Sequence, residues 1–144
     1  MERERLQGQA VIDYEADIYD ACARAVLADY PDCLTSAVNV SAPASFPACS
    51  IVEADSSVDG SRSDSGGIEN AALVSYDVKV YSNLRTGARK QAKKILELVD
   101  VKMSSMNFRR TYRDQGSMSS DASVYQITAR YIAGIDANGK VYRR

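Results

Sequence analysis

The stretch from Leu73 to Tyr112 constrains the fold most, because its hydrophobic period changes twice. Residues Val74–Val80 alternate apolar and polar side chains, which is typical of a half-buried strand. Apolar residues then recur at steps of three and four among lysines and arginines (Ala88, Ala92, Ile95, Val99 and Met103). This spacing predicts an amphipathic helix of about five turns. An extended segment follows at Phe108–Tyr112, so the unit predicts a helix lying on a sheet.

The same periodicities predict elements along the rest of the chain. We expect a first helix over residues 9–30, and the second over 84–103, capped by Ser82 or Asn83. The expected strands are 37–40, 48–54, 69–82, 107–115 and 125–133, with a turn at 115–121 and an Asn-Gly hairpin at 136–139 that lets 141–142 pair back. The expected fold class is α+β: a mostly antiparallel sheet of about four to five strands, with two helices packed on one face.

We expect one domain spanning residues 1–144, a length that suits a single core. The charged residues 1–8 are expected to fray, and the charged start predicts no secretory signal. Residues 55–67 are nearly all Ser, Asp and Gly, and are expected to form a flexible loop. No apolar run approaches the roughly 18 residues that span a bilayer, so we expect no membrane partner.

The composition excludes several classes of chemistry. The chain has no histidine, which removes Ser-His-Asp and Cys-His mechanisms. Its three cysteines form no C-x-x-C pair, and are interpreted as reduced, apolar fillers. Asp55, Asp59 and Asp64 lack the spacing and closing Glu of an EF-hand. We therefore expect no enzyme, no catalytic residues, no cofactor and no metal.

Charge is distributed unevenly, although the net charge is −1. Residues 2–83 carry 14 Asp and Glu against 5 Lys and Arg, whereas residues 84–113 carry 9 Lys and Arg against 2 acidic residues. An acidic half joined to a basic segment favours contact with a polyanion or complementary self-association.

The basic segment 85–113 holds the candidate site. The candidate residues are Arg89 and Lys93 on the second helix, and Arg109, Arg110, Tyr112 and Arg113 on the strand after it. Cations with an interleaved aromatic would suit a nucleic acid, through phosphate neutralisation and stacking. A solvated helix face is the simpler interpretation of residues 89–94, and the acidic sequence pI of about 5.5 argues against nucleic acid. A strand gives the arginine cluster two sides, so it is less easily explained as solvated surface.

Five features of the chain form a pattern when they are taken together. They are the strand Val74–Tyr81, the Ala/Lys-rich helix Ala88–Val99, the Asn107-Phe108-Arg109-Arg110 link, Pro47-x-x-x-Ile51-Val52-Glu53 before a Ser/Asp loop, and the ending Tyr125-x-Ile127-x-x-Arg130-Tyr131 to Asp136-x-x-Gly139-Lys140-Val141-Tyr142-Arg143-Arg144. In this pattern, which spans roughly residues 45–144, the chain resembles the tail terminator (tail completion) proteins of long-tailed bacteriophages.

The resemblance implies an α+β subunit that assembles into a ring, usually of six, and catalyses no reaction. Such a ring caps the growing tail tube, stops polymerisation and presents the surface that joins the head. The implied partners are further copies of the chain, the major tail tube protein and a head-completion or connector protein, with DNA only passing through the lumen. The implied location is the tail or neck of the virion, reached from the host cytoplasm.

On this interpretation the six candidate residues belong to a subunit or tail-tube interface. The alternatives are another phage neck or head-closure ring subunit, a nucleic-acid-binding module that uses residues 85–113, and a small-molecule-binding regulatory domain. The last alternative has no Gly-rich phosphate loop to support it.

Overall fold

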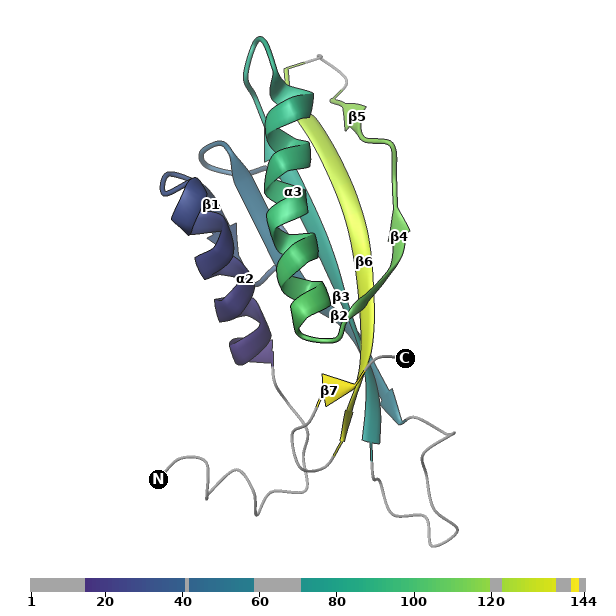
Figure 1. Ribbon diagram of the computed structural model, residues 1–144. Coiled ribbons are helices and arrows are strands. Elements are labelled where there is room, and N and C mark those ends of the chain that lie inside the picture. The colour runs from purple at the N-terminus through teal and green to yellow at the C-terminus, as the bar shows by residue number, and fades with distance from the viewer. Residues whose placement is uncertain (1–14, 41, 59–70, 120–122, 137–140, 143–144) are drawn as a thin grey trace, which may run out of the picture.

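In the part of the chain that the structure describes, two helices lie side by side on one face of a sheet (Figure 1). The structure, a computed structural model, describes residues 15–40, 42–58, 71–119, 123–136 and 141–142. The helices are α2 (Glu15–Asp29) and α3 (Ala88–Ser105). The strands are β1 (Leu34–Ser36), β2 (Ala48–Val58), β3 (Ala71–Ser82), β4 (Arg109–Arg113), β5 (Ser117–Met118), β6 (Tyr125–Asp136) and β7 (Val141–Tyr142).

The sheet runs in the order β1-β2-β3-β6-β4, and the two-residue strands β5 and β7 also pair with β6. All pairings are antiparallel except β1 with β2, which is parallel. The predicted α+β class is confirmed. The described strands slightly exceed the predicted four to five, because short segments were not recognisable by alternation.

The core lies between the helices and the sheet, where the two predicted periodicities meet. The predicted helix stripe is buried in α3, together with Leu96. Alternate residues of β3 and β6 are buried beneath it (Val74, Tyr76, Val78 and Val80; Tyr125, Ile127, Ala129, Tyr131 and Ala133). Tyr76 and Phe108 pack edge to face, with ring centroids 5.6 Å apart. Alternation therefore placed the core face of both strands correctly.

The opposite face of the sheet is polar, as the alternation predicted. Arg130 on β6 lies directly across from Asp77 on β3. Its Nε and Nη2 donate to the two carboxylate oxygens of Asp77, at 2.7 and 3.0 Å. This bidentate pair ties the two central strands together on the face that the helices leave uncovered.

Several predicted boundaries were wrong. The first strand is Leu34–Ser36, not 37–40, because Leu34 N–H donates to the carbonyl of Pro47 and begins the pairing with β2. The second helix begins at Ala88 behind Gly87, and Ser82 instead donates to the side chain of Gln91. The predicted turn at 115–121 contains β5, which pairs with β6.

The predicted loop at 55–67 was also wrong at its start. Residues 55–58 continue β2, because the long β3 offers them a hydrogen-bonding partner in register (Asp55 with Ser75, Val58 with Ala72). Low hydrophobicity did not prevent pairing on an extended ladder. The rest of that loop, the start of the first helix and residues 1–8, which were expected to fray, lie outside the described residues. The predicted hairpin strands are confirmed by pairing of Gly134 with Tyr142, while residues 137–139 of the turn fall outside the described part.

Candidate functional site: a basic seam between helix and edge strand

Helix α3 places two candidate cations on the side that faces the β4 edge of the sheet. The helix buries its apolar stripe against β3 and β6, so its charged residues remain at the surface. Arg89 and Lys93 are four residues apart and therefore lie on the same side of the helix, one turn from each other. Gly87 forms no side-chain cap and the first turn contains no acidic residue, so the positive end of the helix dipole adds to these charges.

Strand β4 divides the remaining candidates between the two faces of the sheet. Arg110 lies opposite Tyr131 and Arg113 lies opposite Ala129, both of which are buried under α3. Residues directly opposite in a ladder share a face, so Arg110 and Arg113 lie on the helix side. Arg109 and Tyr112 lie opposite Ile132 and Arg130 and share the uncovered side.

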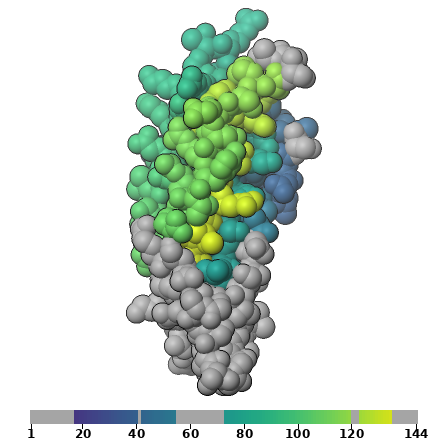
Figure 2. Space-filling model, turned by 90° about the vertical axis from the view of Figure 1, so that its right-hand side faces the viewer, coloured from purple at the N-terminus to yellow at the C-terminus, as the bar shows by residue number. Residues whose placement is uncertain are grey.

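A bulge at Thr111 sets this division. The register shifts between Arg110 and Tyr112, so one extra residue is inserted in β4. Strict alternation would put Arg110 and Tyr112 on one face, whereas the bulge separates them. The structure therefore brings together four of the six predicted residues, Arg89, Lys93, Arg110 and Arg113, which we call the basic seam. Figure 2 faces this side of the molecule, with β4 in light green beside α3.

The charges of the basic seam repel one another. Partial burial and the neighbouring cations Arg89 and Arg113 lower the pKa of the Lys93 ammonium group. Within the described part of the chain, no hydrogen bond or ion pair is recorded for Arg89, Lys93 or Arg113. Uncompensated cations on one surface favour an acidic partner.

Arg110 differs, because Asp100 of α3 neutralises it. Its Nη1 donates to Asp100 Oδ1 at 3.2 Å, and the hydroxyl of Tyr131 donates to the same oxygen at 2.9 Å. Asp100 thereby links α3 to β4 and β6. Sequence reasoning counted this carboxylate only as part of a net charge. The signal that could have identified it is its place one residue after Val99, on the border between the apolar stripe and the surface.

The aromatic side chain that would complete a nucleic-acid site is on the other face. Tyr112 is 54% exposed, but it shares the uncovered side with Arg130 rather than with the basic seam. Stacking of a base on Tyr112 therefore cannot be combined with phosphate contacts to Lys93 and Arg113 on one surface.

A hollow of about 770 Å³ adjoins the upper end of the basic seam, at the start of α3. Its lining combines Arg85 and Arg89 with Leu84 and Met118, two of the exposed large apolar side chains. Exposed apolar area beside cations is typical of protein interfaces. The hollow therefore extends the surface on which a protein partner could bind.

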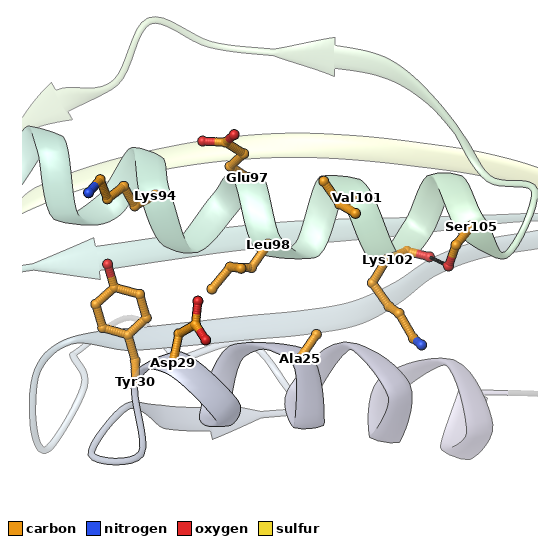
Figure 3. A pocket seen from close by; sticks show the side chains of 9 residues that line it. All are labelled: Ala25, Asp29, Tyr30, Lys94, Glu97, Leu98, Val101, Lys102 and Ser105. Atoms are coloured by element: carbon orange, nitrogen blue, oxygen red, sulfur yellow. Dashed lines mark hydrogen bonds between the residues drawn. The ribbon is translucent and has the colours of Figure 1, made fainter.

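A second groove, of about 590 Å³, lies between the two helices (Figure 3). Asp29, Ala25 and Tyr30 extend from the α2 side toward α3, and Leu98 and Lys102 extend from α3 toward α2. The groove mixes both charge signs, Asp29 and Glu97 with Lys94 and Lys102, so it does not select a charged ligand. Its shape follows from the packing of two helices.

The cysteines are structural in this fold. Cys22, Cys33 and Cys49 are buried in the core, and burial raises the pKa of the Cys22 thiol to about 12 and of the Cys33 thiol to about 11. Such thiols remain protonated and unreactive near neutral pH. Among the residues that the structure describes, no cluster of three or more His, Cys, Asp or Glu could hold a metal ion. No helix in that same part of the chain is long and apolar enough to cross a membrane.

A scan against protein-family models and a search of curated proteins each found no match.

Proposed function

We propose that this chain is a tail terminator of a long-tailed bacteriophage, a structural subunit that catalyses no reaction. Copies of the chain form a ring, of six subunits in the proposed form. The ring caps the tail tube, stops its polymerisation and presents the surface that the head-completion protein joins. DNA passes through the lumen, and the finished ring resides in the neck of the virion.

The observation that carries this proposal is the basic seam, placed at one side of an α+β subunit whose remaining residues carry a net negative charge. A subunit of a closed ring needs two different surfaces that complement each other. The α+β architecture is the one that the sequence resemblance implies, although a fold alone does not specify function. The uncovered sheet face and the hollow at the start of α3 offer further surface for the tube and head partners.

A nucleic-acid-binding module is the alternative that the same cations favour. The separation of Tyr112 from the basic seam weakens it, because cations and aromatic do not form one binding strip. The mass of the protein distinguishes the two. We expect sedimentation at low and moderate salt to give a discrete ring-sized species whose mass is unchanged by duplex DNA.

The decisive assay mixes the purified chain with tail tube protein during polymerisation. We expect the chain to limit tube length and to be found at one tube end by electron microscopy. Tubes that grow to the same length with and without the chain would refute the proposed function. A single subunit that binds DNA, with an affinity that falls steeply with salt, would establish the alternative instead.

A further inference from the structure

An acidic surface lies on α2, within the acidic half of the chain. Asp17 and Asp20 are exposed and three residues apart, so they share one side of the helix; we call this pair the acidic face. The described residues provide neither carboxylate with a recorded hydrogen bond or ion pair. The only exposed cation of α2 is Arg24, one turn beyond Asp20.

The acidic face and the basic seam lie on opposite sides of the molecule. Helix α2 contacts one flank of α3 and reaches β2, near the β1 edge of the sheet. Strand β4 forms the opposite edge and contacts the other flank of α3. Figure 1 shows this arrangement, with α2 on the left and β4 on the right. The subunit therefore has an acidic side and a basic side, with α3 between them.

Two acidic groups beside the basic seam, Asp100 and Asp114, are already engaged within the subunit. Asp100 accepts hydrogen bonds from Arg110 and Tyr131. Asp114 accepts from the backbone N–H groups of Gly116 and Thr128, at 3.0 and 3.1 Å. These carboxylates cannot turn to neutralise Lys93 or Arg113 without losing buried or backbone partners. Glu97, one turn beyond Lys93, offsets one charge at most, so among the described residues the basic seam keeps a net positive charge that a second copy can complement.

We propose that the basic seam of one copy binds the acidic face of α2 in the next copy, so that subunits associate head to tail. This inference rests on the proposed function, in which copies form a ring, and identifies the two surfaces that meet. Because the two surfaces differ and lie on opposite sides, each copy can bind two neighbours. A heterologous contact of this kind closes into a ring when its rotation permits.

If this contact forms, association between copies should depend on salt concentration and on the charges of the two surfaces. Exposed charge pairs are screened over about 8 Å at physiological ionic strength, so association weakens as salt increases. Reversing charges on one surface places like charges opposite each other, which costs several kcal/mol at an interface. Each two-charge reversal should therefore raise the dissociation constant between copies by at least about tenfold.

The test uses the full chain in three forms. The basic-seam variant carries Lys93→Glu and Arg113→Glu, the acidic-face variant carries Asp17→Lys and Asp20→Lys, and the combined variant carries all four. The matched control is Lys94→Glu with Lys102→Glu, which reverses two charges that line the inter-helix groove. Thermal melting verifies folding, and Lys93→Ala with Arg113→Ala replaces the reversal if that variant unfolds.

Sedimentation at low salt then gives the answer. We expect the basic-seam variant and the acidic-face variant each to remain a single subunit when alone, and to assemble when mixed in equal amounts. The combined variant should assemble by itself, and the control should assemble like the original chain. A combined variant that folds but stays a single subunit would overturn the proposed contact. So would an original chain that never associates, or assembly that neither reversal affects. These outcomes leave the tube-capping assay to decide the proposed function separately.

Discussion

The link between α3 and the β4 edge should depend on Asp100, whose removal provides a stringent test of how the basic seam is held in place. Asp100→Ala removes the acceptor of two hydrogen bonds, from Tyr131 at 2.9 Å and from Arg110 at 3.2 Å. Tyr131 is 1% exposed, and its burial and the neighbouring Asp100 carboxylate raise the pKa of its hydroxyl. The hydroxyl therefore has no ready replacement partner when Asp100 is removed.

The loss of stability expected for Asp100→Ala follows from these two hydrogen bonds. An unpaired buried hydroxyl costs about 1–3 kcal/mol. The side chains of Arg110 and Asp100 are 41% and 36% exposed, so their ion pair contributes only about 0–1 kcal/mol. We expect Asp100→Ala to lower the free energy of unfolding by about 2–3 kcal/mol. Tyr131→Phe removes the hydrogen bond to the charged, partly hydrated carboxylate of Asp100 and should lower the free energy of unfolding by about 1.5 kcal/mol.

A double-mutant cycle, followed by urea denaturation, measures the interaction between Asp100 and Tyr131. The double variant Asp100→Ala with Tyr131→Phe should be more stable than the sum of the single effects predicts, by about 1.5 kcal/mol, because the unpaired hydroxyl is gone. Glu97→Ala is the matched control, an exposed carboxylate on the same helix whose removal should change stability by less than about 0.5 kcal/mol. Additive single effects, or a control equal to Asp100→Ala, would refute the reasoning.

Two further predictions concern a glycine and the buried thiols. Gly116→Ala should distort the turn between β4 and β5 and lower the melting temperature by more than about 6 °C, because φ is +82° there and the new Cβ would overlap the hydroxyl of Tyr125. The contribution of Cys22 to stability should be constant below pH 9 and fall above it, because the unfolded Cys22 thiol ionises near 9.0 whereas the folded one stays protonated to about 12. Each such thiol steepens the fall by about 1.4 kcal/mol per pH unit.

Each of these two has its own control. Gly87→Ala shares a positive φ of +87° but meets open space, so calorimetry should show a smaller loss, of about 1 kcal/mol. Equal losses at the two glycines would eliminate the proposed overlap at Tyr125. For the thiols, Cys22→Ala should make the alkaline fall shallower by about one proton, measured by urea denaturation from pH 8 to 11. An unchanged slope would show that Cys22 does not control the alkaline transition.

The local periodicities could be read from the sequence because each depends only on near neighbours. Alternation over Val74–Val80 and the three-and-four spacing over Ala88–Met103 identify the faces that are buried in the structure. Both patterns reflect backbone geometry that every strand or helix shares. The α+β class follows from the order of such elements.

Boundaries were less predictable, because they depend on partners distant in the chain. Residues 55–58 form strand only because β3 continues beside them, and β1 lies at Leu34–Ser36 because its pairing with β2 begins at Pro47. Neither partner is visible in the local composition, which is rich in residues that favour turns.

The candidate site shows the same contrast between what the sequence determines locally and what the tertiary structure decides. The sequence by itself determined that a basic segment follows an acidic half, since charge is a property of composition. The tertiary structure alone decided which cations act together. The bulge at Thr111 separates Arg109 and Tyr112 from Arg110 and Arg113, and Asp100 neutralises only Arg110. A bulge is set by strand pairing and an ion pair by side-chain distance, so neither can be read from the order of residues.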